Sequence, residues 1–279
     1  MKVVFFTKLF KSYSPDELIE FAAAQGLDGF DLAVRPEYPI NQDNIATELV
    51  PFSKKAADSG LSIELATIGM RPLDLADPST EAAWAACAKA GVPRIKLGYA
   101  VWEKARPWKD QYDEFRRYVE GCCELSLKHG PKSVIHTHSG PYVGINASSV
   151  RHLLDGMDPK GVGAYLDFAH LAADGEPPDL AIATSGEYLA MVAAKNMRYV
   201  AHDGSPAYCV QPGSHWKPDW CTLADGIVSW SHVIAELREA GYDGAISLHG
   251  EYTDRHSLES VLDVFVKDVE FMKGLVSAD

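Results

Sequence analysis

Histidine and acidic residues gather in short polar segments that end or follow apolar runs between residues 133 and 251. These segments supply His136, His138, Asp167, His170, His202, His249 and Glu251. Imidazole nitrogens and carboxylate oxygens that converge on one point are typical ligands of a divalent metal of borderline softness. A histidine also titrates near neutral pH, so one that does not bind metal could act as a general base. The residue types therefore predict a metal site, an acid–base site, or both.

Eight short apolar runs are predicted to be the strands that position these residues. They cover Val3–Phe6, Gly29–Val34, Ser62–Thr67, Arg94–Gly98, Ser133–His138, Gly163–Asp167, Arg198–His202 and Ala245–His249. Amphipathic segments separate most of them, and the first begins with the capping-box sequence Ser14-Pro15-Asp16-Glu17. Continuous apolar runs are typical of parallel strands that are buried on both faces. This alternation predicts one α/β domain over residues 1–279, a closed (β/α)8 TIM barrel.

An open, doubly wound sheet is the alternative arrangement for such elements. That fold usually carries a glycine-rich phosphate loop after its first strand. Here the first run is followed by Thr7-Lys8-Leu9-Phe10-Lys11, which contains no glycine. In a barrel, catalytic groups lie at the carboxyl ends of the strands and in the loops that follow. The polar segments stand at those ends, which favours the barrel.

Other polar and aromatic side chains near the predicted strand ends could bind a substrate. This set consists of Lys8, Arg35, Glu64, Lys96, His138 and Trp216. The cations could contact substrate oxygens or phosphate, or could instead pair with neighbouring carboxylates such as Asp31. The tryptophan could pack on the apolar face of a sugar. It belongs to Ser205–Ala224, a stretch too long and aromatic for a plain connection and predicted to be an active-site loop after the seventh strand.

Four short motifs give the chain a resemblance to a known superfamily. They are Gly26-Leu27-Asp28-Gly29-Phe30-Asp31-Leu32, Asp167-Phe168-Ala169-His170, Leu223-Ala224-Asp225-Gly226-Ile227-Val228-Ser229-Trp230 and Gly241-Tyr242-Asp243-Gly244-Ala245-Ile246-Ser247-Leu248. In this order they resemble the xylose-isomerase-like barrels. That superfamily contains sugar-phosphate isomerases and epimerases, hydroxypyruvate isomerase and apurinic-site endonucleases. The motifs are more specific for the fold than for the reaction.

The resemblance implies a metal site with one ligand from each of the last four strands. In that superfamily the ligands are Glu, Asp, His and Glu on strands five to eight, and the glutamates move a proton between neighbouring carbons of a keto sugar. By position, Asp167 matches the aspartate, while His136 and His249 replace the glutamates. The seventh-strand position falls on Val200, with His202 two residues further on. The implied metal ligands are therefore His136, Asp167, His249 and His202.

The replaced glutamates alter the expected chemistry. Fewer carboxylates weaken the binding of Mg²⁺ and favour Mn²⁺, Zn²⁺, Co²⁺ or Fe²⁺, or no metal. The two-glutamate proton shuttle cannot be transferred, so Glu251, His170 and His202 become the candidate catalytic groups. We expect a metal-dependent isomerase or epimerase that acts on a keto sugar or related polyhydroxy carbonyl compound through an enediolate. The alternatives are a lyase or dehydratase on an oxidised sugar, and an inactive sugar-binding or partner subunit.

Composition narrows the range of partners and locations. The 279 residues carry a formal net charge of −13, which disfavours binding to nucleic acid or to an anionic membrane surface. A local basic pocket for one small anion remains compatible with it. The five cysteines show no metal-type spacing, and no signal peptide or membrane span is recognisable, so a cytoplasmic location is expected. Barrels of the superfamily often pair, so a homo-oligomer is compatible with the resemblance.

Overall fold

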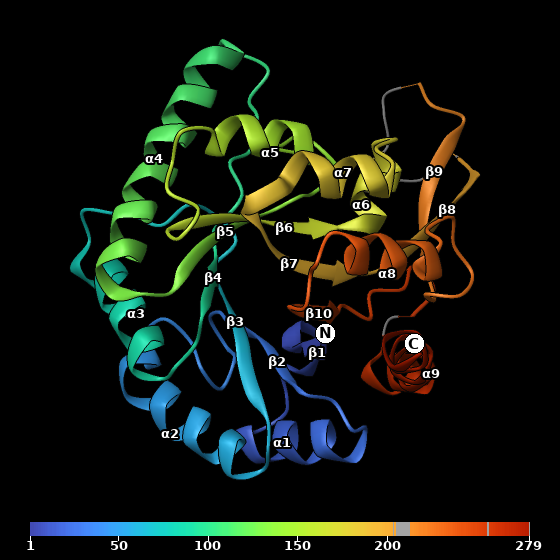
Figure 1. Cartoon of the computed structure of the whole chain (residues 1–279), viewed down its shortest axis with the longest axis horizontal. Coiled ribbons are helices and arrows are strands. Elements are labelled where there is room, and N and C mark those ends of the chain that lie inside the picture. Colours follow the sequence, from blue (N-terminus) through green and yellow to red (C-terminus); the bar gives the residue numbers. More distant parts are fainter. Residues whose placement is uncertain (203, 205–212, 256, 279) are drawn as a thin grey trace.

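Eight parallel strands close into a barrel in the computed structural model, which describes residues 1–202, 204, 213–255 and 257–278. The strands follow one another around the barrel in the order β1-β10-β7-β6-β5-β4-β3-β2 (Figure 1). Their bounds are β1 Lys2–Phe6, β2 Gly29–Val34, β3 Ser62–Ile68, β4 Arg94–Lys96, β5 Lys132–His136, β6 Val162–Asp167, β7 Leu189–Ala194 and β10 Ala245–Leu248. The predicted fold class is confirmed.

Helices surround the barrel and cover the outer faces of its strands. They are η1 Thr7–Phe10, α1 Pro15–Ala24, α2 Ile45–Asp58, α3 Pro78–Lys89, α4 Trp108–His129, α5 Ala147–Leu154, α6 Phe168–Ala173, α7 Pro178–Ser185, η2 Gly186–Tyr188, α8 Trp230–Glu239 and α9 Leu258–Ser277. The predicted capping box forms, because the Ser14 side chain accepts from the Glu17 backbone and the Glu17 carboxylate accepts from the Ser14 backbone. Within the described residues, none of the helices has the length and apolar character needed to cross a membrane.

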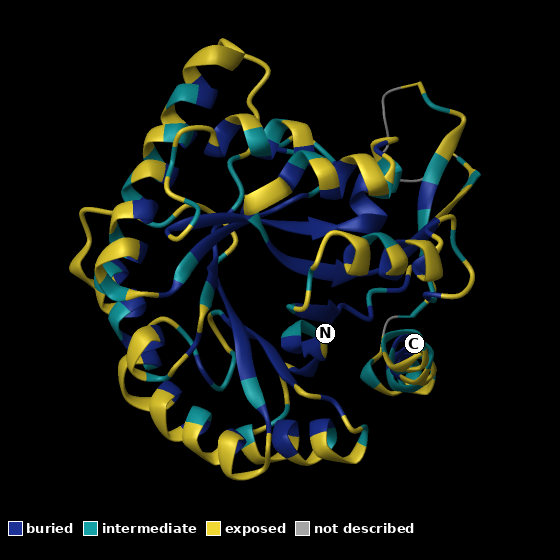
Figure 2. Cartoon of the chain, viewed as in Figure 1, coloured by how far each residue is buried: buried dark blue, intermediate teal, exposed yellow. Residues whose placement is uncertain are grey.

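The core has two layers because successive side chains of a strand point to opposite faces. Val4, Leu65 and Val134 belong to a small cluster with Tyr165 inside the barrel. Phe5 and its neighbours form the larger cluster between the strands and the helices. Figure 2 shows the consequence: the barrel strands are buried along most of their length, whereas each helix exposes one face.

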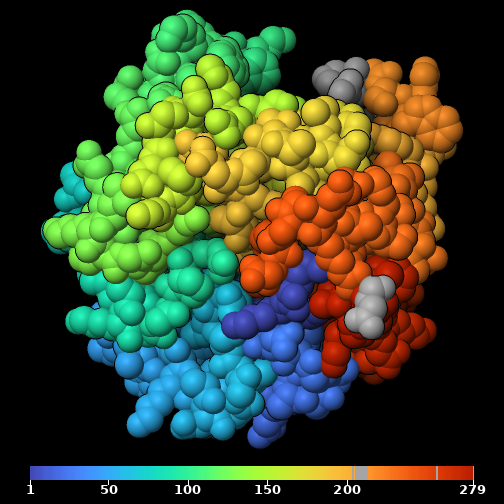
Figure 3. Space-filling view, in the orientation of Figure 1, coloured from blue at the N-terminus to red at the C-terminus, as the bar shows by residue number. Residues whose placement is uncertain are grey.

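The first strand and the last elements of the chain lie side by side where the barrel closes. β1 pairs with β10 through Lys2 and Ala245 and with β2 through Val4 and Gly29. The ring of Phe265 in α9 lies 6.3 Å from that of Phe5 in β1. Figure 3 shows the blue amino terminus beside the red carboxyl-terminal helix on one face of the molecule. The last helix therefore covers the first strand.

Gly29 occupies the tightest contact between two barrel strands. It pairs with Ser62 at the start of β3 and has a backbone φ of +149°. A Cβ atom placed on it would lie 1.8 Å from the carbonyl oxygen of Ser62. No side chain fits there unless the two strands separate.

The seventh strand of the barrel differs from the prediction. The strand is β7, Leu189–Ala194, whereas Arg198–His202 overlaps β8 (Asn196–Ala201), which lies outside the barrel. Strand β8 pairs antiparallel with β9 (Trp216–Cys221) in a separate two-stranded sheet. The prediction was wrong because β7 is rich in alanine, which has a weak strand preference, while β8 contains Tyr199 and Val200.

The stretch Ser205–Ala224 is only partly described. Residues 205–212 lie outside the described part of the chain, and the rest contributes β9 rather than a plain loop. The sheet formed by β8 and β9 is inserted between β7 and α8 (Figure 1). Trp220 of β9 reaches the mouth of the barrel, where its ring centroid lies 4.5 Å from the ammonium of Lys195.

Candidate active site

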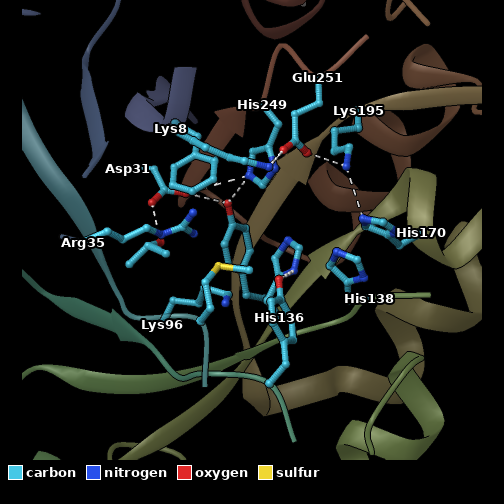
Figure 4. A pocket seen from close by; sticks show the side chains of 15 residues that line it. Lys8, Asp31, Arg35, Lys96, His136, His138, His170, Lys195, His249 and Glu251 are labelled. Carbon is cyan, nitrogen blue, oxygen red and sulfur yellow. Dashed lines mark hydrogen bonds and ion pairs between the residues drawn. The ribbon is translucent and has the colours of Figure 1, made fainter. Parts of the chain in front are cut away.

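The carboxyl ends of all eight barrel strands open into one cavity. Residues on the strands, or just beyond them, line it. The charged and imidazole side chains around it are Lys8, Asp31, Arg35, Lys96, His136, His138, His170, Lys195, His249 and Glu251 (Figure 4). The predicted residues Lys8, Arg35, Lys96, His136, His138, His170, His249 and Glu251 are thus brought together.

A buried trio forms the candidate metal site at the base of this cavity. The trio consists of His136 at the end of β5, Asp167 at the end of β6 and His249 after β10, with one donor atom from each within 4.8 Å of the others. Asp167 Oδ2 lies 3.5 Å from His136 Nε2 and 4.0 Å from His249 Nδ1. Within the described structure, neither Asp167 Oδ2 nor His136 Nε2 has a hydrogen-bond partner. Unpaired buried lone pairs are costly, and a cation between them would satisfy both, so these residues fit a divalent metal.

Hydrogen bonds on the far side of the imidazoles orient the trio. Tyr165 Oη donates to Asp31 Oδ2 at 2.9 Å and lies 2.8 Å from His249 Nε2. Because the phenol proton goes to Asp31, His249 Nε2 donates to Tyr165, which leaves Nδ1 unprotonated toward Asp167. Tyr99 Oη lies 2.8 Å from His136 Nδ1 and can hold that ring in the same way. Such contacts fix the tautomer that binds metal.

Burial controls the charge of these groups. Desolvation, with Lys96 and Lys195 as further causes, lowers the pKa of His136 well below its usual value. The pKa of His249 is likewise lowered by burial, although Asp167 opposes the effect. Both imidazoles are therefore neutral, which is the form that coordinates a metal. Burial also raises the pKa of Asp31 to about 6, against the hydrogen bonds from Thr67, Tyr165 and Ser247.

Lys195 was missed by the sequence reasoning and holds a central place in the site. It directly follows β7, and the adjacent Ala194 accepts a hydrogen bond from the His249 backbone at 3.2 Å. Its ammonium donates to Glu251 Oε2 at 2.7 Å and lies 3.2 Å from His170 Nε2. An ammonium group thus stands at the strand end where the resemblance implied a metal-binding histidine. Correct placement of β7 would have revealed it.

Glu251 is held between two ammonium groups. Lys195 contacts one oxygen of its carboxylate, and Lys8 from η1 contacts the other. Burial opposes ionisation of Glu251, but Lys195 and Lys8 together outweigh it and hold the pKa well below the usual range. The group is therefore a carboxylate at neutral pH.

His138 and His170 stack beside the metal trio, with their ring centroids 3.7 Å apart. His170 Nε2 faces the Lys195 ammonium, so Nδ1 carries the proton and donates to Ser139 Oγ at 2.8 Å. His138 Nδ1 lies 2.9 Å from the Ser139 carbonyl oxygen and donates to it. Burial, followed by the neighbouring His136, lowers the pKa of His138 to about 3. Both rings are neutral hydrogen-bonding groups at the cavity wall.

Three predicted site residues lie away from this cavity. Glu64 is near the amino end of β3, where it pairs with Lys2 at 2.5 Å and Arg94 at 3.2 Å. His202 follows β8 and donates its backbone N–H to the His215 carbonyl at 2.8 Å, so it belongs to the inserted sheet. Trp216 begins β9 and is 58% exposed. The prediction placed Glu64 at the wrong end of its strand. The predictions for His202 and Trp216 were wrong because the seventh strand was misplaced.

Lys96 ends β4 and brings a buried ammonium to the cavity. Only 3% of the residue is exposed, and its Nζ lies 3.6 Å from the ring centroid of Tyr99. Burial lowers the pKa of Lys96 to about 7; Arg35 and Lys8 act in the same direction, while Asp31 opposes them. The free-energy cost of burying the charge is fully present below pH 7. It declines between pH 7 and 10.5, because only the unfolded chain is then protonated.

Lys96→Met is expected to stabilise the fold in a pH-dependent way. At about pH 6 the free energy of unfolding should rise by roughly 2–4 kcal/mol, because an unpaired buried charge is replaced by an apolar chain of similar length. The gain should shrink at about pH 9.5, where the folded wild type already holds a neutral amine. Urea unfolding of wild type and Lys96→Met at both pH values measures this gain in unfolding free energy. Lys89→Met, which replaces an exposed lysine, is the control. Equal gains at the two pH values would contradict the assignment.

The fold and the polar cavity together define a class of protein. The family model of the xylose isomerase-like TIM barrel matches residues 19–275. The chain therefore belongs to the xylose isomerase-like TIM barrel family. No curated protein shows a significant match to the sequence.

Solved structures of similar fold include sugar epimerases. The 3-keto-D-glucoside 4-epimerase YcjR of E. coli is 15% identical with a TM-score of 0.72, over 98% of this chain and 99% of that one. A D-psicose 3-epimerase is 16% identical with a TM-score of 0.71, over the whole of both chains. The probable 3-DHS dehydratase AsbF of Bacillus anthracis is 17% identical with a TM-score of 0.70, over 98% and 99% of the two chains. At these identities the likeness establishes the fold.

Proposed function

We propose that the protein is an isomerase or epimerase of a keto sugar or a related polyhydroxy carbonyl compound, with a divalent metal held by His136, Asp167 and His249. The observation that carries this proposal is the pair of buried donor atoms, His136 Nε2 and Asp167 Oδ2, 3.5 Å apart and without hydrogen-bond partners in the described structure. Two imidazoles and one carboxylate favour Zn²⁺, Mn²⁺, Co²⁺ or Fe²⁺ over Mg²⁺. A bound metal of this kind polarises a carbonyl and makes the neighbouring C–H more acidic.

Glu251 is the proposed proton acceptor. It lies two residues beyond His249, lines the cavity and is ionised at neutral pH. Lys195 contacts both Glu251 and His170, so it links the carboxylate to the stacked imidazoles. The neutral rings of His138 and His170 would bind substrate hydroxyls. The proposed division of roles is a carboxylate that moves the proton and imidazoles that orient the sugar.

The test is proton exchange at carbon. Metal-loaded protein is incubated in D₂O with a panel of ketoses and keto sugar acids, and ¹H NMR follows new isomers and deuterium uptake beside the carbonyl. Glu251→Gln is expected to slow conversion by about 10²–10⁴-fold, the usual contribution of a general base, and to keep the metal. The exposed Glu259→Gln should behave as wild type. The proposal fails if metal-loaded wild type neither converts nor exchanges any member of the panel.

A dehydratase acting on an oxidised sugar is the second candidate. The observation that favours it is the basic wall of the cavity, where Arg35 and Lys96 face the space that a substrate would fill. Such a reaction begins with the same loss of a proton next to a carbonyl and continues with expulsion of water. The same NMR experiment separates the two, because only the dehydratase gives a product that has lost one water, either an enone or the deoxy-dicarbonyl compound to which an enol product tautomerises.

Tyr165→Phe is expected to weaken metal binding without unfolding the barrel. The change removes the hydroxyl that donates to Asp31 and contacts His249 Nε2. Loss of such an orienting partner usually lowers metal affinity by about 10–100-fold. Competition with a chromogenic chelator measures the affinity. Tyr188→Phe, which removes a hydroxyl bonded to the Met157 carbonyl, is the matched control and should leave the affinity unchanged.

A further inference from the structure

In the part of the chain that the structure describes, two cations on one side of the cavity each have a buried nitrogen without a hydrogen-bond acceptor. Arg35 follows β2 and Lys96 ends β4, and Figure 4 shows both on the Asp31 side, away from His170 and Lys195. Among the described residues, neither Arg35 Nε nor Lys96 Nζ has a hydrogen-bond partner, although both atoms are buried. A buried charge without a partner is expensive. A group from outside the chain would remove that cost.

Nearby carboxylates are already engaged by other groups. Asp31 accepts hydrogen bonds from Thr67, Tyr165 and Ser247, at 2.8, 2.9 and 3.1 Å. Glu251 is bound by Lys8 and Lys195. The contacts of Lys96 and Arg35 that the structure shows are with aromatic rings: Lys96 lies over Tyr99, and the Arg35 guanidinium carbon is 5.3 Å from the ring centroid of Phe6.

The charge balance of the cavity contrasts with that of the whole protein. Four basic side chains, Lys8, Arg35, Lys96 and Lys195, line a space to which Asp31 and Glu251 bring carboxylates, and Asp167 at its base brings a third. The chain as a whole has a formal net charge of −13. A local excess of positive charge inside an acidic protein attracts and selects a negatively charged ligand. A divalent metal at the proposed site would add to this excess.

We infer that Arg35 and Lys96 form a subsite for an oxyanion of the substrate, a carboxylate or a phosphate, so that the substrate is an acidic sugar derivative. This inference rests on the proposed function for the identity of the rest of the substrate. A guanidinium offers two parallel donors to an oxyanion, and an ammonium adds a third, so the pair matches the donor needs of either group. Arg35 and Lys96 line the same cavity as His136 and His249 of the metal trio. One acidic sugar in this cavity could therefore contact both the subsite and the metal site.

Binding without turnover tests the subsite. Isothermal titration calorimetry with metal-loaded protein compares a six-carbon aldonate, the corresponding alditol phosphate and the uncharged alditol, none of which has an aldehyde or ketone group to react. At least one of the two anions should bind about 10-fold or more tightly than the alditol, as charge-assisted hydrogen bonds imply. The stronger of the two identifies the oxyanion as carboxylate or phosphate. Equal affinity for all three compounds would overturn the inference.

Substitutions of Arg35 and Lys96 test whether the anion preference depends on these two residues. Arg35→Gln and Lys96→Met should each lower affinity for the preferred anion by about 10–100-fold and leave affinity for the alditol unchanged. Arg35→Lys, which keeps the charge, should retain much of the preference, and the exposed Lys89→Met should retain all of it. An anion preference that survives both Arg35→Gln and Lys96→Met in folded protein would place the anion elsewhere.

The binding result is separable from the proposed reaction. An anion preference that depends on Arg35 and Lys96, in a protein that converts no sugar, supports the subsite and contradicts the isomerase. Conversion of neutral ketoses by a protein that shows no anion preference would support the isomerase and contradict the subsite.

Discussion

Asp167→Asn is expected to abolish metal binding at the proposed site and to lower kcat/KM by about 10³-fold or more, because a Lewis-acid metal contributes several kcal/mol to the transition state. The change keeps Oδ1, which accepts hydrogen bonds from the Ala169 and His170 backbones, both at 3.1 Å, at the start of α6. It replaces Oδ2, the atom that faces His136 and His249, with an amide NH₂ that cannot coordinate a cation. Elemental analysis of protein purified without chelator and a rate assay measure both effects.

The matched control is Asp263→Asn, which removes an exposed carboxylate from α9 and should leave metal content and rate unchanged. Stoichiometric metal that persists in Asp167→Asn would show that the ion binds elsewhere. Absence of metal from both wild type and variant would favour the sugar-binding or partner subunit over the enzyme.

Gly29→Ala is expected to cost about 4 kcal/mol of unfolding free energy or more, in the range where single substitutions are exceptional. The new Cβ would lie 1.8 Å from the Ser62 carbonyl oxygen, and the backbone φ of +149° already disfavours a side chain. Because β2 and β3 are adjacent strands of a closed barrel, they cannot separate without disturbing their neighbours. Urea unfolding monitored by circular dichroism gives the difference.

Gly60→Ala is the comparison for Gly29→Ala. Gly60 also has a positive φ, +76°, but a Cβ atom there would meet no atom within 4 Å. The Gly60→Ala substitution should lower the free energy of unfolding by about 1 kcal/mol, because only the backbone conformation disfavours the new side chain. Similar losses for the two variants would show that the strand contact is not the cause.

Most of the barrel could be predicted from the sequence because a buried parallel strand leaves a strong local signal. β2, Gly29–Val34, has the bounds that its apolar run predicts. β7 is also a continuous apolar run, but three of its six residues are alanine, which has a weak strand preference. The segment that follows it is more β-prone and was predicted in its place. That segment pairs with β9 instead, and such a pairing between distant residues cannot be read from local pattern.

The candidate site was predictable where residue type and strand end coincide, as for His136, Asp167 and His249. Lys195 was missed because its strand was misplaced. Tyr165 was missed because a tyrosine within a strand resembles a core residue, and its contacts with Asp31 and His249 depend on barrel closure. Glu64 could have been excluded, since it is the third residue of its strand and faces the amino end.

The sheet of β8 and β9 is attached to the barrel rim without taking part in the hydrogen-bond ladder of the eight strands. Its Trp220 nevertheless packs against Lys195 and lies 4.8 Å from the His170 ring. A rim appendage of this kind can change in length or sequence while the framework beneath it stays intact. Among related barrels, evolution is therefore expected to adjust the size of the accepted molecule in this segment, and to leave the buried charges below it in place.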